Sequence, residues 1–310
     1  MPDYYWLVMV VFVDVAHVYS TLFKTYFDRQ NFSLHRNLYL IVPIVCYVVG
    51  VMLHSESSMF YWRLLAYLAV FHFIRQQYGF FRLYSRKEEM GNWTYYLDNV
   101  TIYMATLYPI VYWHTHPDTP FSWFVENDFL TFRSEVTSAT VACLYAIVLI
   151  AYVVKEIVLA FMNKRINVPK NLILIGTAAS WYLSIIYFKS DMAFTTINIL
   201  SHGLPYMALI YAEGKKASLN NTSKVLKTVF QKSYGILVFV ALLILFAYFE
   251  EGLWDALVWQ EHKVIFPAFH QLLPFLSNAN ILALLVPLLS LPQTTHYVLD
   301  GFIWKREKQG

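Results

Sequence analysis

The chain has 310 residues, of which 58% are hydrophobic and 18% aromatic, while only 14% are charged. A soluble domain of this length would carry roughly a quarter charged residues, so the composition argues against a soluble globular protein. The net charge of +3 is small. We find neither a glycine-rich phosphate loop nor a low-complexity tract in the sequence, and we therefore expect no nucleotide or nucleic-acid binding.

Charged residues gather in short runs that separate long apolar stretches. These stretches have about 18 to 27 residues, enough to cross a hydrocarbon layer of about 30 Å as helices. We expect an all-α transmembrane bundle of about nine spans that forms a single domain over residues 1–310. The first stretch lacks a basic leader and is interpreted as a retained helix. The expected helices cover approximately residues 4–23, 38–54, 59–83, 94–113, 136–161, 171–188, 192–212, 233–250 and 276–303.

Lysine and arginine gather in alternate loops of this layout, which predicts its orientation because basic loops stay in the cytoplasm. The loops on the opposite side hold only Arg133, Lys189 and Lys263, and they are acidic instead. We therefore expect an integral membrane protein, of the kind found in a bacterial inner membrane, with its N-terminus outside and its C-terminus in the cytoplasm. The basic residues on the cytoplasmic side are Lys24, Arg29, Arg36, Arg82, Arg86, Lys87, Lys164, Arg165, Lys170, Lys215, Lys216, Lys224, Lys227, Lys232, Lys305, Arg306 and Lys308.

Four of the ten histidines fall inside expected helices, namely His17, His72, His202 and His296. Their helices all run in the same direction, and seven to thirteen residues separate each histidine from the first basic residue of the following loop. At 1.5 Å per residue, the four imidazoles lie roughly 10–20 Å above the cytoplasmic boundary. This common depth predicts a shared metal site. The other six histidines, which lie in loops or at helix ends, are His35, His54, His114, His116, His262 and His270.

Each of the four histidines has a polar residue one helical turn away, on the same face of its helix. Metal-bound imidazoles usually donate their second N–H to such a group. The two aspartates are candidate catalytic groups that can act as metal ligands, as hydrogen-bond partners of the ligands or as proton relays, and the second role is preferred. The arginine can pair with an acid or hold an anionic end of a substrate. The neighbours are Asp14, Arg75, Gln76, Asn198 and Asp300.

The histidine segments resemble the bacteriorhodopsin-related protein family, the bacterial and archaeal membrane carotene-cleaving dioxygenases. The best match is residues 294–305, TTHYVLDGFIWK, because the family also ends with a histidine, an aspartate, an aromatic-aliphatic run and a basic residue. Residues 71–73, FHF, are similar to its second motif, and residues 14–17, DVAH, lie where its first histidine is expected. The third motif differs, since Asn198 stands where the family has a histidine four residues before the next one. The first motif lacks the family's Pro-His-Gly pattern.

The resemblance covers about forty residues in four short patches. It implies a polytopic fold in which His17, His72, His202 and His296 bind a non-haem Fe(II). Integral-membrane desaturases and hydroxylases match less well, because the sequence has none of their His-x-x-x-His or His-x-x-His-His boxes.

We therefore expect a membrane-embedded iron oxygenase or other oxidoreductase that acts on a lipid-soluble polyene, isoprenoid or acyl chain. Its partners would be the bilayer, a hydrophobic substrate, molecular oxygen and an electron donor. Zinc and copper remain alternative metals, since imidazole suits all three. Three other functions stay open: a proton-coupled transporter that uses the same histidines and aspartates, a haem protein with two axial histidines, and a structural or assembly protein.

Overall fold

The computed structural model describes residues 2–86, 88, 91–119, 121–219 and 223–304. Lys87, Lys305, Arg306 and Lys308, which contribute to the topology argument, lie outside these residues. The described residues are mainly helical and contain no strand, which confirms the all-α expectation.

The elements are, in chain order, α1 (Asp3–Trp6), η1 (Leu7–Val15), α2 (Ala16–Ser20), η2 (Thr21–Phe23), α3 (Arg29–Leu34), α4 (Arg36–Glu56), α5 (Ser58–Ser85), α6 (Asn92–Thr115), α7 (Glu135–Asn163), α8 (Val168–Tyr182), η3 (Leu183–Tyr187), α9 (Asp191–Ser218), α10 (Lys224–Gln231), α11 (Gly235–Trp254), η4 (Asp255–Trp259), α12 (Pro267–Leu272), α13 (Ala279–Leu289) and α14 (Leu291–Ile303).

Four helical segments are long and apolar enough to cross a membrane: Asp3–Phe23, Arg36–Glu56, Glu135–Met162 and Gly235–Trp259. The pair α13 and α14 is a fifth candidate if it counts as one span. The other expected helices are present as α5, α6, α8 with η3, and α9, but they are not among these candidates. Polar side chains inside a helix lower its mean hydropathy, as Arg75, Gln76 and Gln77 do in α5.

The last expected helix, residues 276–303, is divided into α13 and α14, which meet at an angle of 42°. Pro292 lies in the first turn of α14. A proline has no backbone N–H and crowds the preceding turn, so it favours a new helix start at this point. The bend therefore separates the apolar α13 from the segment that carries His296.

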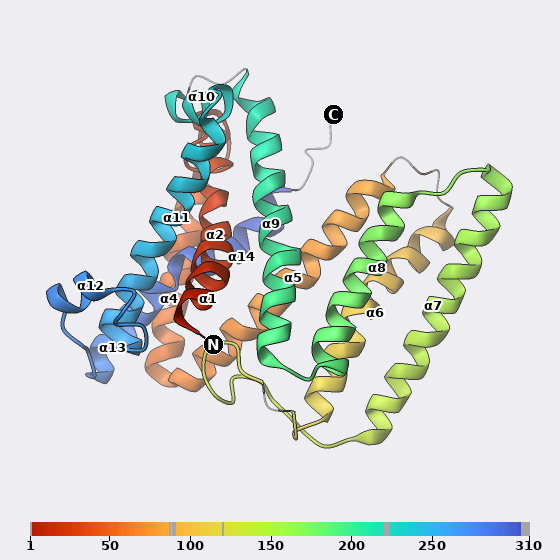
Figure 1. The fold of residues 1–310 in the computed structure, drawn as a ribbon, viewed down its shortest axis with the longest axis horizontal. Coiled ribbons are helices and arrows are strands. Elements are labelled where there is room, and N and C mark those ends of the chain that lie inside the picture. Colours follow the sequence, from red (N-terminus) through yellow and green to blue (C-terminus); the bar gives the residue numbers. More distant parts are fainter. Residues whose placement is uncertain (1, 87, 89–90, 120, 220–222, 305–310) are drawn as a thin grey trace. The chain divides into compact units, whose positions relative to one another are not determined.

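The chain divides into two compact units. Unit 1 comprises residues 1–65 and 203–310, and unit 2 comprises residues 66–202. In unit 1, α11 packs along η1 and α2, and α4 packs on α13 and α14 (Figure 1). Its main core includes Val11, Phe23, Tyr206, Phe230 and Phe239.

Unit 2 is built on α6, which packs against both α7 and α8 (Figure 1). Trp181 and Phe194 are almost fully buried in one of its cores, and Phe81 and Ile102 are buried in a second. Two helices, α5 and α9, belong to both units, because the division falls at residues 65 and 203 inside them. Each of these two helices carries one of the candidate histidines.

Candidate metal centre

His17 and His296 form a pair in unit 1. They come from α2 and α14, which pack against each other, and their side chains are 2% and 1% exposed. The ring centroids are 5.1 Å apart, with the rings nearly perpendicular at 78°. This contact joins residues almost 280 positions apart in the sequence, as the common depth of the two histidines predicts.

A chain of hydroxyl groups supports the His296 side of this pair. Thr21 Oγ1 lies 2.7 Å from His296 Nδ1, and 3.1 Å from the hydroxyl of Tyr206. Tyr206 donates a hydrogen bond of 2.9 Å to the Asp300 carboxylate, which also accepts 2.6 Å from the Trp304 indole N–H. A chain of hydroxyl groups thus connects Asp300 to His296 through Tyr206 and Thr21.

The hydroxyl at Nδ1 fixes the orientation of the His296 ring. When Nδ1 donates to this hydroxyl, Nε2 carries the lone pair with which the ring can ligate an ion. On the other ring, the carboxylate of Asp14 lies 3.5 Å from His17 Nδ1, which is an ion-pair distance beyond the usual hydrogen-bond range. A short contact between an oxygen and Nδ1, typical of metal-binding histidines, is thus present at His296.

The helix that leads to His17 is a π-helix, η1, rather than the regular α-helix that the sequence predicts for residues 4–23. The wider turn changes the register of the side chains before α2, and Asp14 lies in its last turn. π-helical segments are uncommon and are often found at functional sites. The backbone at Asp14, just before His17, is therefore an unusual one, which apolar periodicity does not reveal.

His72 and His202 form a second pair, in unit 2. They lie on α5 and α9 and are 3% and 1% exposed. Their ring centroids are 4.9 Å apart at an angle of 79°, which closely matches the geometry of the first pair. The ring of Phe73 lies 3.9 Å from that of His202 and covers one side of it.

The amides expected beside these two histidines contact main-chain groups. Gln76 donates to the carbonyl oxygen of His202 at 3.2 Å, so it ties α5 to α9 at this histidine. Asn198 donates to the carbonyl oxygen of Phe194 within its own helix. Arg75 is exposed, hydrogen-bonds the hydroxyl of Tyr103 and lies over the ring of Tyr78. Arg75 therefore contacts tyrosines on α5 and α6.

His202 is followed by Gly203 within the continuous helix α9, and the division between the two units falls at this peptide bond. Gly203 packs closely within unit 1. A Cβ atom at this position would lie 3.2 Å from both the side chain and the carbonyl oxygen of Val13, and 3.6 Å from Cβ of His17. The glycine therefore allows α9 to approach η1 and α2 immediately after His202.

All four histidines are buried, two in each unit, and each is a potential metal ligand. Imidazole nitrogen is a good ligand for iron, copper and zinc, so the ligand type does not distinguish these metals. The residues fit a metal because buried imidazoles, one of them held through Nδ1 by the Thr21 hydroxyl, are groups that such an ion requires.

Thr21, Tyr206 and Trp304 are residues of this region that the sequence analysis did not identify. Thr21 follows His17 by four residues, and Tyr206 follows His202 by four. The i,i+4 rule that selects Asp300 also places these hydroxyls on the histidine faces. Because threonine and tyrosine are common in membrane helices, spacing alone does not separate them from packing residues.

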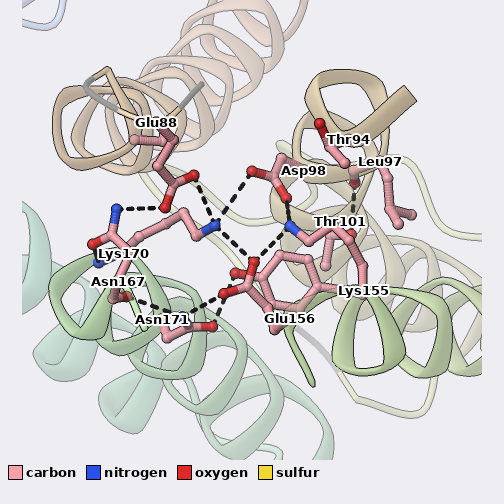
Figure 2. Close-up of polar contacts among 12 residues, drawn as sticks. Glu88, Thr94, Leu97, Asp98, Thr101, Lys155, Glu156, Asn167, Lys170 and Asn171 are labelled. Atoms are coloured by element: carbon pink, nitrogen blue, oxygen red, sulfur yellow. Dashed lines mark hydrogen bonds and ion pairs between the residues drawn. The ribbon is translucent and has the colours of Figure 1, made fainter. Parts of the chain in front are cut away.

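A second buried polar cluster, which the sequence analysis missed entirely, lies in unit 2 (Figure 2). Lys155 and Glu156 on α7 meet Asp98 on α6, and Lys170 on α8 joins them. The Lys170 ammonium is 2.7 Å from Glu156, 3.0 Å from Glu88 and 3.6 Å from Asp98. We call these five side chains the ion network.

The ion network contains Lys170, which the sequence predicts to be a charge in a cytoplasmic loop. Its side chain is instead 1% exposed and is surrounded by three carboxylates. Asn167 and Asn171 bond the outer oxygens of Glu88 and Glu156, and thereby complete the cluster. The charges of the ion network are thus balanced mainly by one another.

Comparison with known proteins identifies no relative: no protein-family model, no curated protein and no solved structure matches the chain.

Proposed function

We propose that the chain is a membrane-embedded, metal-dependent oxygenase in which His17, His72, His202 and His296 hold one metal ion. The observation that carries this proposal is the pair of matching histidine contacts, one in each unit, connected through His202 and Gly203. Covalent continuity supports this proposal, because a Cβ atom at Gly203 would lie 3.6 Å from Cβ of His17 in unit 1, while the adjacent His202 contacts His72 in unit 2.

The choice of iron and of oxygen chemistry rests on the family resemblance of the histidine segments. Iron with open coordination positions would supply oxygen activation, and an external electron donor would supply reducing equivalents where the reaction requires them. The chain's own residues would orient the imidazoles through Thr21 and Asp14, and the apolar surroundings would exclude water from the substrate. A substrate that reaches a buried site in a membrane protein is lipid-soluble, such as a polyene, an isoprenoid or an acyl chain.

We further propose the full topology of nine spans, with the N-terminus outside and the C-terminus in the cytoplasm. The alternation of basic and acidic loops supports it, as do helices at all of the expected positions. Reporter fusions after residues 57, 91, 132 and 165 would alternate between the two sides. Two successive fusions on the same side would contradict the proposed topology.

A transporter is the second candidate, and the hydroxyl chain from Asp300 through Tyr206 and Thr21 to His296 favours it. Such a chain can pass protons as well as orient a ligand. Metal content separates the two functions, because a proton relay of this kind needs no bound metal. A Soret band in the absorption spectrum would instead identify a haem protein.

The test is metal analysis of the purified protein and of His72→Ala, His296→Ala and His116→Ala. We expect about one metal ion per chain in the wild type, a loss of most of it in the first two variants and no loss in the third. His116 is the control because it stacks on Tyr112 at the end of α6, away from the four candidates in the sequence. Full metal in His72→Ala and His296→Ala would refute the proposed centre.

A further inference from the structure

Unit 1 contains a cavity of about 620 Å³ that the proposed metal centre does not use. It lies where α4 ends and α5 begins, and its other walls come from η4 and the first turns of α13. Ligand-binding cavities typically measure about 300–1,000 Å³, so the volume suits a molecule of moderate size.

The cavity lies at the end of a candidate membrane span, because α4 is one of the four helices long and apolar enough to cross a bilayer. Two tryptophans, Trp62 and Trp259, line it with ring centroids 5.5 Å apart. Trp254 stacks on Trp259 behind them. Tryptophans concentrate at the boundary between lipid and water, where one edge of the ring is apolar and the N–H is hydrated.

The lining is divided between polar and apolar side chains. Serines 55, 57 and 58 with His54 form the polar part, whereas Ala283 and Val286 belong to the apolar wall on α13. The Nδ1 atom of His54 is buried and has no hydrogen-bond partner among the described residues, while its Nε2 lies 3.3 Å from Ser58 Oγ. A buried nitrogen without a partner is costly, so it favours a ligand that brings a hydroxyl or carbonyl group.

The charges of the lining select the chemistry of that group. Among the described residues that form the cavity, none is a lysine or an arginine, and Glu56 is the one carboxylate. An anionic headgroup such as a carboxylate or phosphate would find no cation there, and it would face the negative charge of Glu56. A neutral polar end group meets neither penalty.

We propose that this cavity binds a neutral single-chain lipid, a long-chain alcohol or aldehyde, with its polar end at His54 and its chain against Trp62 and α13. The exposed side chain of Leu284 at the cavity gives the chain a contact with the surrounding bilayer. That this lipid is the substrate of the metal centre rests on the proposed function, whereas the binding site itself does not.

The probe for the test is hexadecanol that carries a diazirine and an alkyne, reconstituted with the full chain in phosphatidylcholine vesicles. We expect irradiation to label peptides covering residues 54–62 and 279–286, and an excess of plain hexadecanol to suppress the labelling. Palmitic acid with the same diazirine and alkyne should label these peptides several-fold less, because its headgroup is anionic. Equal labelling by the acid, or labelling that plain hexadecanol does not reduce, would overturn the proposal.

Two variants localise the bound chain. Ala283→Trp should fill the apolar wall and reduce the labelling several-fold, whereas Ala146→Trp, on an exposed position of α7, should leave it unchanged. Unchanged labelling in Ala283→Trp would also overturn the proposal, and competition in the wild type provides the test if that variant does not fold. His296→Ala should keep full labelling, so a wrong metal centre and a wrong lipid site give different results.

Discussion

The ion network of unit 2 and the His17–His296 pair of unit 1 are both buried polar clusters, but they differ in how their polarity is satisfied. In the ion network, the ammonium of Lys170 is within 3.6 Å of three carboxylates, and Lys155 contacts two of them. In the histidine pair, two imidazole rings meet each other, Asp14 lies 3.5 Å from His17, and the Thr21 hydroxyl contacts His296.

The difference indicates what each cluster is built for. The two ammonium groups and three carboxylates of the ion network pair with one another and hold α6, α7 and α8 together. Two perpendicular imidazoles gain little from each other, whereas a cation between them would use both. We therefore assign a structural role to the ion network and a metal-binding role to the histidines. Substitutions in each cluster test these two roles.

The largest effect on stability is expected for Lys170→Met. This change removes one cation from the ion network and leaves Glu88, Asp98 and Glu156 without their shared partner, and breaking a buried ion pair typically costs about 3–5 kcal/mol. Thermal unfolding in detergent should show the loss, while the folded fraction should keep its metal. Stability like that of the wild type would mean that the ion network is not structural.

Gly203→Leu should affect both stability and metal content. A side chain at this position would meet the backbone and side chain of Val13, and overpacking of this kind typically costs about 1–3 kcal/mol. Because the displaced helix carries His202, we also expect weaker metal binding. Gly176→Leu is the matched control, since a Cβ atom there meets nothing within 4 Å. Equal behaviour of the two variants would show that the close approach of α9 is unimportant.

Thr21→Val should leave the fold intact and weaken metal binding by roughly 10–100-fold, which is the usual effect of losing the group that orients a metal-bound histidine. The measurement is the metal affinity, determined by competition with a chelator of known strength. Thr25→Val is the control, because the Thr25 hydroxyl donates to the main-chain carbonyl of Thr21. An unchanged affinity in Thr21→Val would separate the hydroxyl chain from the metal site.

Tyr206→Phe should have the smallest effect. It removes the hydroxyl between Thr21 and Asp300 but leaves the Thr21–His296 contact in place. We expect a loss of about 1 kcal/mol in stability, the usual contribution of one hydrogen bond, and a smaller decrease in metal affinity than for Thr21→Val. A larger decrease than in Thr21→Val would show that Asp300 acts on the centre by another route.

The helices and the two histidine contacts could be predicted from the sequence, because both leave a signal in short stretches of it. The length of each apolar stretch predicts a helix, and the number of residues to the next basic residue predicts the depth of His17 and His296. Pro287 and Pro292 carry the signal for the bend between α13 and α14, because prolines kink membrane helices. The π-helical register of η1 leaves no trace in apolar periodicity.

The polar partners were harder to predict, because a helix face allows several directions for a long side chain. Arg75 follows His72 by three residues, yet its guanidinium contacts Tyr78 and Tyr103. The ion network joins Asp98, Lys155 and Lys170 from three helices. Such contacts depend on tertiary packing, and a single sequence contains no direct record of them.

We propose that histidines from both units share one metal ion. The direct test is an X-ray absorption spectrum of the purified protein at the absorption edge of the metal. The proposed centre predicts about one metal per chain whose spectrum contains the multiple-scattering pattern of four imidazoles. A spectrum with two imidazoles, or two metal ions per chain, would mean that the histidine pairs bind separately and would contradict the account.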